Sequence, residues 1–297
     1  KSHVSFAVDP LFSQFYANPL YLNPALAGSQ RCTRMILNYR NQPYPGFGTF
    51  STYSFSIDNF FENLSGGLGF NVVHDNQGGL LSTTIAGITY SYQGRISRDW
   101  HINFGIQASY MNHRLNWNEL TFPDQHNPFN TSTAISNESP PYSTNSHSAN
   151  FAAGFVFYNR NLFAGASVNN ITQPAFEFLT DQKLQRKYTL HFGYDFVLYR
   201  GRTRHLSSDD INISPNMIVQ SQGEFNYINY GLYATILPIK TGVWFRHNLK
   251  HQNSLIFMLG LKLEDLTIGY SYDHSLSGFT RIGGGAQIGR ASCRVRV

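Results

Sequence analysis

Few residues in this chain have the type and spacing that enzyme chemistry requires. Ser109 and His113 are four positions apart, so on a strand they would share one face and could form the Ser–His pair of a barrel-embedded hydrolase. That face is the polar one of its segment, which is the wrong side for an enzyme that attacks membrane lipid. The G-x-S-x-G, P-loop and H-E-x-x-H motifs are absent. The sequence therefore predicts no catalytic residues, and we expect the protein not to be an enzyme.

Metal binding has only weak support in the sequence. His247 and His251 have the spacing of a helical metal-binding pair, but they flank a predicted hairpin loop and lack further ligands at suitable spacing. The 17 acidic residues are dispersed, so no general acid–base pair stands out. Cys32 and Cys293 could form one disulfide, although two cysteines give no framework. We predict no metal ion and no cofactor.

The basic residues give no sign of nucleic-acid binding. The net charge is +5, but Arg and Lys are scattered along the chain rather than gathered in one stretch. The densest group is a predicted turn at 200–205, which fits a solvated turn better than a docking patch. Its basic residues are Arg200, Arg202, Arg204 and His205.

The segments that would carry these residues alternate in character. From about Thr33 onward, strand-length segments follow one another with turn residues between them. A period of two indicates a strand with two unlike faces. The clearest case runs from His101 to Tyr110. One face carries Ile102, Phe104, Ile106, Ala108 and Tyr110, and the other carries Asn103, Gly105, Gln107 and Ser109.

Composition favours a membrane barrel over a soluble β protein. Of the 297 residues, 41% are hydrophobic, 15% are aromatic and only 13% are charged, which is about half the usual charged share of a soluble domain. The longest apolar run, 151–158, is far shorter than the roughly 20 residues of a membrane-spanning helix. Strands with one lipid-facing and one lumen-facing side reconcile these facts. A soluble β-sandwich or propeller, the alternative, fits them poorly.

The sequence therefore predicts an all-β protein, a single transmembrane antiparallel β-barrel of about 14 strands within residues 32–297. We place the strands at 32–40, 47–57, 66–75, 79–94, 99–117, 147–158, 161–169, 186–199, 210–221, 224–236, 239–247, 252–263, 265–274 and 279–290.

The connections between these strands predict an orientation. Most even-numbered connections are short, and the odd-numbered ones include the two longest, 118–146 and 170–185. Short turns of outer-membrane barrels face the periplasm, so both ends of the barrel sequence would lie there. The connection 118–146 is rich in Asn, Ser, Thr and Pro, and we expect it to be a mobile surface loop.

Residues 1–31 precede the predicted barrel. Residues 4–8 resemble the remnant of a signal peptide with cleavage near Ala7, so residues 1–7 are set apart from the rest. The following stretch, 9–28, is broken by prolines yet aromatic, whereas disordered tails are poor in aromatic residues. We expect it to be ordered and packed against the barrel wall or in its mouth. Its aromatic residues are Phe12, Phe15, Tyr16 and Tyr21.

Short motifs spread along nearly the whole chain resemble those of one family. The run DPLFSQF at 9–15 is followed by NPLYLNPA at 18–25. Further matches are NYRNQ at 38–42, GGLG at 66–69, LTFPDQ at 120–125, SVNNITQP at 167–174, RKYTLH at 186–191, ISPN at 213–216 and IGYSYD at 268–273. On these motifs the chain resembles the PorP/SprF family, which comprises outer-membrane proteins of the type IX secretion system and gliding machinery of Bacteroidetes.

The resemblance implies an outer-membrane barrel that serves secretion or surface attachment of cargo. The implied partners are outer-membrane lipid, other type IX secretion components and a secreted cargo protein, with no nucleic acid. Two alternatives from another class are a general outer-membrane pore and a barrel-embedded lipase.

The closing segment departs from the pattern of outer-membrane barrels, which usually end in an alternating strand with a terminal aromatic residue. Residues 289–297 have no aromatic residue and include Arg290, Arg294 and Arg296. An arginine on the lipid face at the bilayer midplane costs about 2–4 kcal/mol. The run resembles translated sequencing-adapter read-through, so we expect it not to be native; the alternative is an unusual periplasmic tail. Pro43, where the family usually has Trp, is a second departure.

Overall fold

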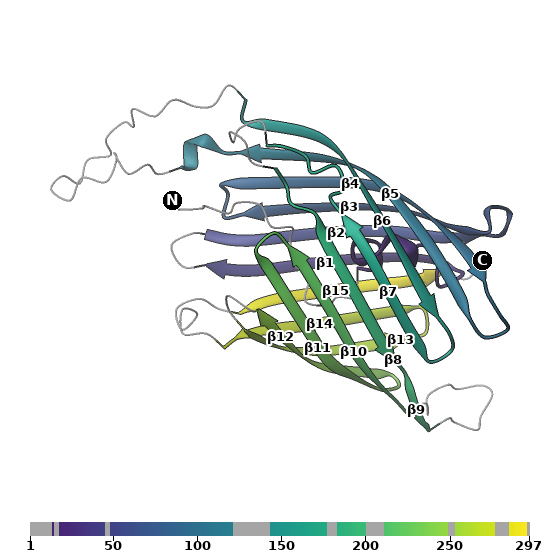
Figure 1. Ribbon diagram of the computed structural model, residues 1–297. Helices are drawn as coiled ribbons and strands as arrows, with labels where there is room; N and C mark the ends of the chain where they lie inside the picture. The colour runs from purple at the N-terminus through teal and green to yellow at the C-terminus, as the bar shows by residue number, and fades with distance from the viewer. Residues whose placement is uncertain are drawn as a thin grey trace.

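The structure is a computed structural model that describes residues 14, 18–44, 48–120, 143–176, 183–199, 211–248, 253–276 and 285–295. Within these ranges the strands form one antiparallel sheet that closes on itself as a barrel (Figure 1). The predicted all-β fold with 14 strands is confirmed. No helix in the described ranges is long and apolar enough to span a bilayer.

The strands follow the chain around the barrel, each paired with its sequence neighbours except that β8 and β9 both pair with β10. They are β1 (Thr33–Tyr44), β2 (Gly48–Phe61), β3 (Gly66–Gln77), β4 (Leu81–Arg95), β5 (His101–Leu115), β6 (Asn145–Tyr158), β7 (Leu162–Asn169), β8 (Lys187–Tyr194), β9 (Phe196–Tyr199), β10 (Ile211–Gln222), β11 (Phe225–Ile236), β12 (Ile239–Asn248), β13 (Ser254–Leu263), β14 (Leu266–Ser275) and β15 (Ala286–Val295). The short helical elements are α1 (Pro19–Leu22), η2 (Pro24–Leu26), η3 (Glu62–Leu64) and η4 (Trp117–Glu119).

One predicted strand is interrupted. The segment predicted at 186–199 is divided at Asp195 into β8 and β9, and both pieces pair with β10. Asp195 leaves the ladder because its backbone N–H donates to the carbonyl of Asn161, 2.7 Å away, while the Asn161 amide donates to the Asp195 carbonyl at 2.9 Å. The two pieces therefore count as one of the 14 barrel strands.

The last strand lies later in the sequence than predicted. It was expected at 279–290 but is β15, 286–295, which pairs with β14 on one side and with β1 on the other. The pairing of Tyr39 with Gly289 and of Thr33 with Val295 closes the barrel. The pairing therefore uses the segment that departs from the usual barrel ending, and it includes the backbone of Arg290 and Arg294.

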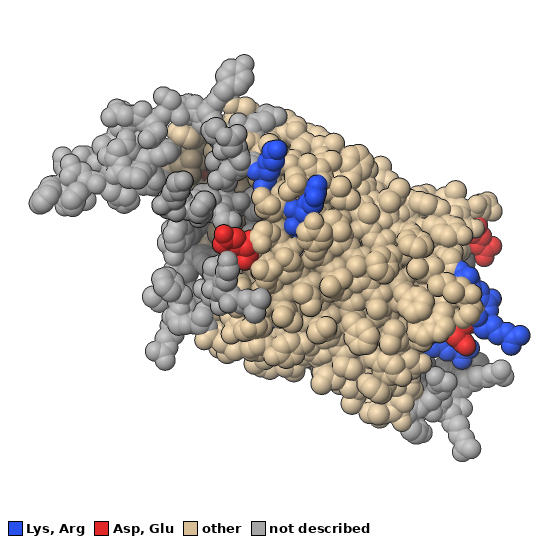
Figure 2. All heavy atoms as spheres, viewed as in Figure 1, with Lys and Arg blue, Asp and Glu red and all other residues tan. Residues whose placement is uncertain are grey.

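The two faces of each strand follow the predicted alternation. In β5, the side chains of Phe104 and Ile106 are 52% and 63% exposed on the outside of the barrel. Asn103, which directly precedes Phe104, is 1% exposed and faces the lumen. Burial of polar side chains and exposure of Leu, Ile, Phe and Tyr is the inverse of a soluble protein and suits a wall surrounded by lipid. The space-filling view shows an uncharged wall, with the visible Lys, Arg, Asp and Glu residues toward its two ends (Figure 2).

The connections sort by length only in part, because the two-residue turn between β10 and β11 lies at the same end as the longest connection, and the connection 200–210 lies at the end with most of the short turns. Two-residue or similarly tight turns follow β6, β11 and β13 at one end, which we call the short-turn end. The long connection between β5 and β6 lies at the opposite end. Under the general rule for such barrels, the short-turn end faces the periplasm. Residues 121–142 of the long connection and the basic turn at 200–205 lie outside the described residues.

Candidate functional site

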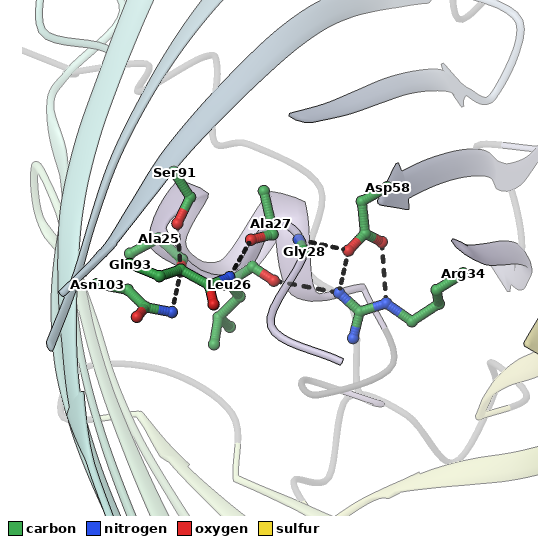
Figure 3. Close-up of polar contacts among 9 residues, drawn as sticks. All are labelled: Ala25, Leu26, Ala27, Gly28, Arg34, Asp58, Ser91, Gln93 and Asn103. Carbon is green, nitrogen blue, oxygen red and sulfur yellow. Dashed lines mark hydrogen bonds and ion pairs between the residues drawn. The ribbon is translucent and has the colours of Figure 1, made fainter. Parts of the chain in front are cut away.

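The lumen of the barrel is occupied by residues 18–28, which we call the plug. The plug consists of α1 and η2, each of which begins at a proline, Pro19 and Pro24. Proline is favoured at the first position of a helix because its fixed φ suits the helix and its missing N–H has no helical partner there. Leu20, Asn23 and Ala25 are at most 1% exposed. The plug is thus enclosed by the wall, as the close-up also shows (Figure 3).

Asn23 fixes the plug at the junction of its two helical turns. Its side-chain oxygen accepts from the backbone N–H of Ala25 at 2.9 Å and so caps η2. Its side-chain amide donates to the carbonyls of Phe155 on β6 and Ala166 on β7, at 3.0 and 3.1 Å, and lies 3.1 Å from the ring of His191 on β8. One side chain therefore joins the plug to three neighbouring strands.

The backbone carbonyls of the plug are satisfied by side chains of the wall. The Ala25 carbonyl accepts from the hydroxyl of Ser91 on β4 at 3.0 Å and from the amide of Asn103 on β5 at 3.3 Å (Figure 3). The Leu22 carbonyl accepts from Ser167 on β7 at 2.8 Å. Buried backbone groups without partners are costly, so these wall side chains make the buried position of the plug possible.

A buried ion pair holds the end of the plug where it joins β1. Arg34 on β1 and Asp58 on β2 are directly opposite in the strand register, and both side chains face the lumen. The guanidinium donates to both carboxylate oxygens, at 2.9 and 2.8 Å. The same carboxylate accepts from the Gly28 N–H at 2.8 Å, and the Arg34 guanidinium donates to the Leu26 carbonyl at 3.2 Å (Figure 3). Both charges are therefore used to bind the plug backbone.

Small residues in the wall let the plug backbone come close. A Cβ added to Gly105 on β5 would lie 2.2 Å from the Ala25 nitrogen, and one added to Gly67 on β3 would lie 2.3 Å from the Ala27 oxygen. Real Cβ atoms essentially never approach other heavy atoms that closely. Gly28 has φ +64°, a left-handed conformation that glycine adopts without strain. The wall and the plug are complementary in shape at these positions.

Apolar contacts complete the enclosure on the other side of the lumen. Leu22 of the plug packs with four buried wall residues, and Leu26 packs against the same cluster. The wall residues come from β10 to β13 and are Ile218, Tyr233, Trp244 and Ile256. Lumen-facing apolar residues are unusual in a water-filled barrel, so their presence here indicates a packed interior.

The connection between β7 and β8 also enters the barrel, near the end opposite to the short turns. Phe176 and Leu184 are 4% and 2% exposed and pack with Met111 on β5. The ring of His113 meets Phe176 edge to face, with ring centroids 4.6 Å apart. Phe176 and Leu184 of this connection thus fill the half of the lumen near the end opposite to the short turns, and the plug fills the other half.

Replacing Asn23 with alanine should loosen the plug without unfolding the barrel. The change removes a helix cap, usually worth about 1 kcal/mol, and leaves two strand carbonyls without their donor, at about 1–3 kcal/mol for an unsatisfied buried group. Limited proteolysis of the folded protein should then cut within the N-terminal segment faster than in the wild type. Asn145→Ala, at an exposed position on β6, is the matched control. Equal cleavage rates in the Asn23 and Asn145 variants would contradict the anchoring role.

The structure separates the two residues of the possible hydrolase pair. Ser109 and His113 both face the lumen, as their parity predicts, but they have different partners. The Ser109 hydroxyl donates to the Asn150 carbonyl at 3.2 Å, and the His113 ring lies 3.0 Å from the Thr83 hydroxyl. Four residues of strand separate their backbones by roughly 13 Å. They do not form a Ser–His dyad.

The other candidate ligands are not brought together either. The His247 ring lies 3.0 Å from the Asn253 side-chain oxygen, and His251 lies outside the described residues. Among the described residues, no group of three or more His, Cys, Asp and Glu could hold a metal ion. Cys32 and Cys293 are both free, so the possible disulfide is not formed.

Arg290 occupies a different position from the one that its cost in lipid led us to expect. It has the same parity on β15 as the buried Ile288 and Ser292, and its guanidinium donates to the Ser292 hydroxyl at 3.1 Å. It lines a cavity of about 240 Å³ together with Arg34 and Gln14. Arg290 therefore faces the lumen, not the lipid. Arg296 lies outside the described residues.

Sequence reasoning missed the polar residues that bind the plug. Arg34, Asp58, Asn23, Ser91 and Asn103 were not singled out as a group. Their signal was present in part, because Arg34, Asp58 and Asn103 are charged or amide residues at lumen-facing strand positions. What they bind could not be seen from alternation alone.

The family model described as "Type IX secretion system membrane protein PorP/SprF" matches residues 4–287. The chain belongs to the PorP/SprF family. This PorP/SprF chain is located in the outer membrane, in agreement with the resemblance seen in its motifs. A search of curated protein sequences finds no match.

Solved structures of a channel and of an outer-membrane protein are similar to this PorP/SprF chain. The CymD monoaromatic hydrocarbon channel aligns with a TM-score of 0.56 and 9% identity, over 95% of this chain and 93% of that one. The outer-membrane protein Omp33 of Acinetobacter baumannii aligns with a TM-score of 0.48 and 8% identity, over 89% and 98% of the two chains. At these identities the first alignment supports the barrel fold alone.

Proposed function

We propose that this PorP/SprF barrel is a closed component of the type IX secretion machinery that assists secretion or surface attachment of cargo. The observation that carries the proposal is the enclosed plug, held by the Arg34–Asp58 ion pair and by Asn23. A barrel whose lumen is filled by its own chain offers its surfaces, rather than a water-filled path, to other molecules. Family membership supports secretion-system proteins as those partners.

The general pore is the first alternative, and the packed lumen argues against it. A diffusion pore needs a continuous polar, water-filled interior. Here Leu22 packs with Trp244 and other buried apolar residues, and Phe176 with Met111 fills part of the opposite half. Both obstacles are built from the same chain as the wall and would have to move before a solute could cross.

The barrel-embedded lipase is the second alternative. It would require a serine nucleophile within hydrogen-bond reach of a histidine, on a face that lipid can reach. Ser109 and His113 face the lumen and are bonded to other groups. We therefore propose a function without catalysis.

The closed lumen predicts low solute flux. Liposomes that contain the purified wild-type protein should swell in isotonic small sugars no faster than liposomes without protein. A known porin reconstituted at the same density is the positive control. Swelling at the porin rate would favour the general pore over the proposal.

The role in secretion needs a test in the source organism. Deletion of the gene should leave type IX cargo inside the cell or unattached, and the wild-type gene should restore secretion. Affinity purification from detergent-solubilised outer membranes should recover other type IX components. Unchanged cargo secretion in the deletion strain would refute the proposed role.

A further inference from the structure

A cavity at the short-turn end lies between the end of the plug segment and the wall. Its volume is about 390 Å³, within the range of sites that bind small molecules. It is bounded on one side by Ser29 and Arg31, which follow the plug. The remaining lining residues come from β4, β5 and β6 and are Gln93, Gly94, Arg95, His101 and Tyr158.

The lining is cationic. Arg31 and Arg95 are permanently charged, His101 adds an imidazole, and no Asp or Glu lines the cavity. In the described part of the chain, neither Arg31 nor Arg95 forms a salt bridge with an acidic residue. Asp99, the nearest acid in sequence to Arg95, is exposed in the turn and does not line the cavity. Two positive charges thus border the same space without a carboxylate beside them.

The two arginines are held in place by other contacts. Arg31 has φ +51°, its backbone N–H donates to the Gly28 carbonyl at 3.0 Å, and its guanidinium lies 5.0 Å from the centre of the Phe60 ring. The Arg95 guanidinium donates to the carbonyls of Ser97 and Arg98, at 2.9 and 3.3 Å. Neither set of contacts neutralises the charge, and a guanidinium has five N–H donors, so some remain for a ligand.

The wall side chains that line the cavity lie on the lumen-facing side of their strands, and Arg31 and Arg95 are exposed. Gln93 and Arg95 continue the parity of Ser91 on β4, and His101 that of Asn103 on β5, and both Ser91 and Asn103 are buried in the lumen. The ring of His101 is stacked on that of Tyr158, with centroids 5.3 Å apart. A lipid headgroup outside the wall would face the opposite side of these strands.

We propose that this cavity binds the carboxylate or phosphate group of a soluble periplasmic anion. Arginine matches both groups because its planar fork can donate two parallel hydrogen bonds to two oxygens. The Gln93 amide and the Tyr158 hydroxyl are further polar groups for the uncharged part of such a ligand. The site is distinct from the plug contacts and does not depend on the proposed role in secretion.

Phosphate binding to the full-length protein tests the site. The protein is placed in nanodiscs of phosphatidylcholine, and inorganic phosphate is titrated at constant ionic strength by calorimetry. We expect saturable binding that weakens about a hundredfold in the double variant Arg31→Gln/Arg95→Gln, since each of the two lost charge-assisted bonds is worth about a factor of ten. The control is Arg98→Gln/Arg160→Gln, which removes two exposed arginines that do not line the cavity. That control should bind phosphate as the wild type does.

Three results would overturn the proposal. They are an absence of saturable binding of both phosphate and acetate in the wild type, equal weakening in the two double variants, and a loss of anion affinity when phosphatidylglycerol replaces part of the lipid. The last would assign the site to a lipid headgroup. A titration with acetate in place of phosphate shows whether the site binds a carboxylate or a phosphate group. Saturable binding of either anion supports the site. Heat-modifiable migration on gels checks that each variant is a folded barrel.

Discussion

Replacing Asp58 with alanine is expected to destabilise the folded barrel by about 3–5 kcal/mol, the usual cost of removing one partner from a buried ion pair. The Arg34 guanidinium would remain in the lumen without its carboxylate, and the Gly28 N–H would lose its acceptor. Both side chains are at most 10% exposed, so water would compensate only in part. The measurement is the free energy of unfolding in urea, in detergent or lipid.

Two control variants distinguish the effect of breaking the ion pair from the effect of removing one negative charge. Asp99→Ala removes a carboxylate from an exposed turn at the same end and should change stability by a few tenths of a kcal/mol, as is usual at the surface. Arg34→Met/Asp58→Leu removes both charges and should recover part of the loss, because no unpaired charge remains. If the Asp58→Ala and Asp99→Ala variants were equally stable, the Arg34–Asp58 ion pair would not hold the plug in place.

A single methyl group at Gly105 is expected to displace the plug. The added Cβ would lie 2.2 Å from the Ala25 nitrogen and 2.3 Å from the Pro24 carbonyl carbon, both of which are backbone atoms that cannot turn away. Overpacking of this kind costs about 1–3 kcal/mol, and moving the plug relieves it. Gly105→Ala should therefore expose the N-terminal segment to protease, while the residues of the β7–β8 connection still fill the other half of the lumen.

The matched control for Gly105 is Gly260 on β13. It has the same lumen-facing parity as the buried Ile256, but a Cβ added there would meet its nearest neighbour at 3.4 Å, an ordinary contact. Gly260→Ala should leave protease sensitivity at the wild-type level. Equal behaviour of the two alanine variants would mean that the plug does not press on the wall at Gly105.

The wall was predictable because its pattern is local. Each strand repeats its apolar and polar residues with period two, so β5 and β13 could be recognised without knowledge of their neighbours. The interruption at Asp195 could not, since it depends on hydrogen bonds to Asn161, which is 34 positions away. The end of the last strand was also misplaced, because pairing with β1 and β14, rather than the sequence of β15, fixes its length.

The plug was only half predictable. Aromatic and proline residues in 9–28 indicated a packed segment, yet whether it lay on the wall or inside depended on residues far along the chain. Asn23 reaches Phe155 and Ala166, which are more than a hundred positions away. Arg34 and Asp58 offered the better signal, because they are opposite each other in a hairpin and share the lumen-facing parity. Residues 9–13 and 15–17 of that segment lie outside the described residues.

The position of the plug can be measured most directly by cross-linking in native outer membranes. The Asn18 amide lies 2.7 Å from the Ser54 hydroxyl on β2. In a chain whose Cys32 and Cys293 are replaced with serine, Asn18→Cys/Ser54→Cys should be linked in high yield by a bismaleimide of short span. Asn18→Cys/Glu62→Cys should not be linked, because Glu62 lies roughly 25 Å farther along the chain from Ser54. Equal yields for the two pairs, or no link in either, would contradict a plug held inside the barrel.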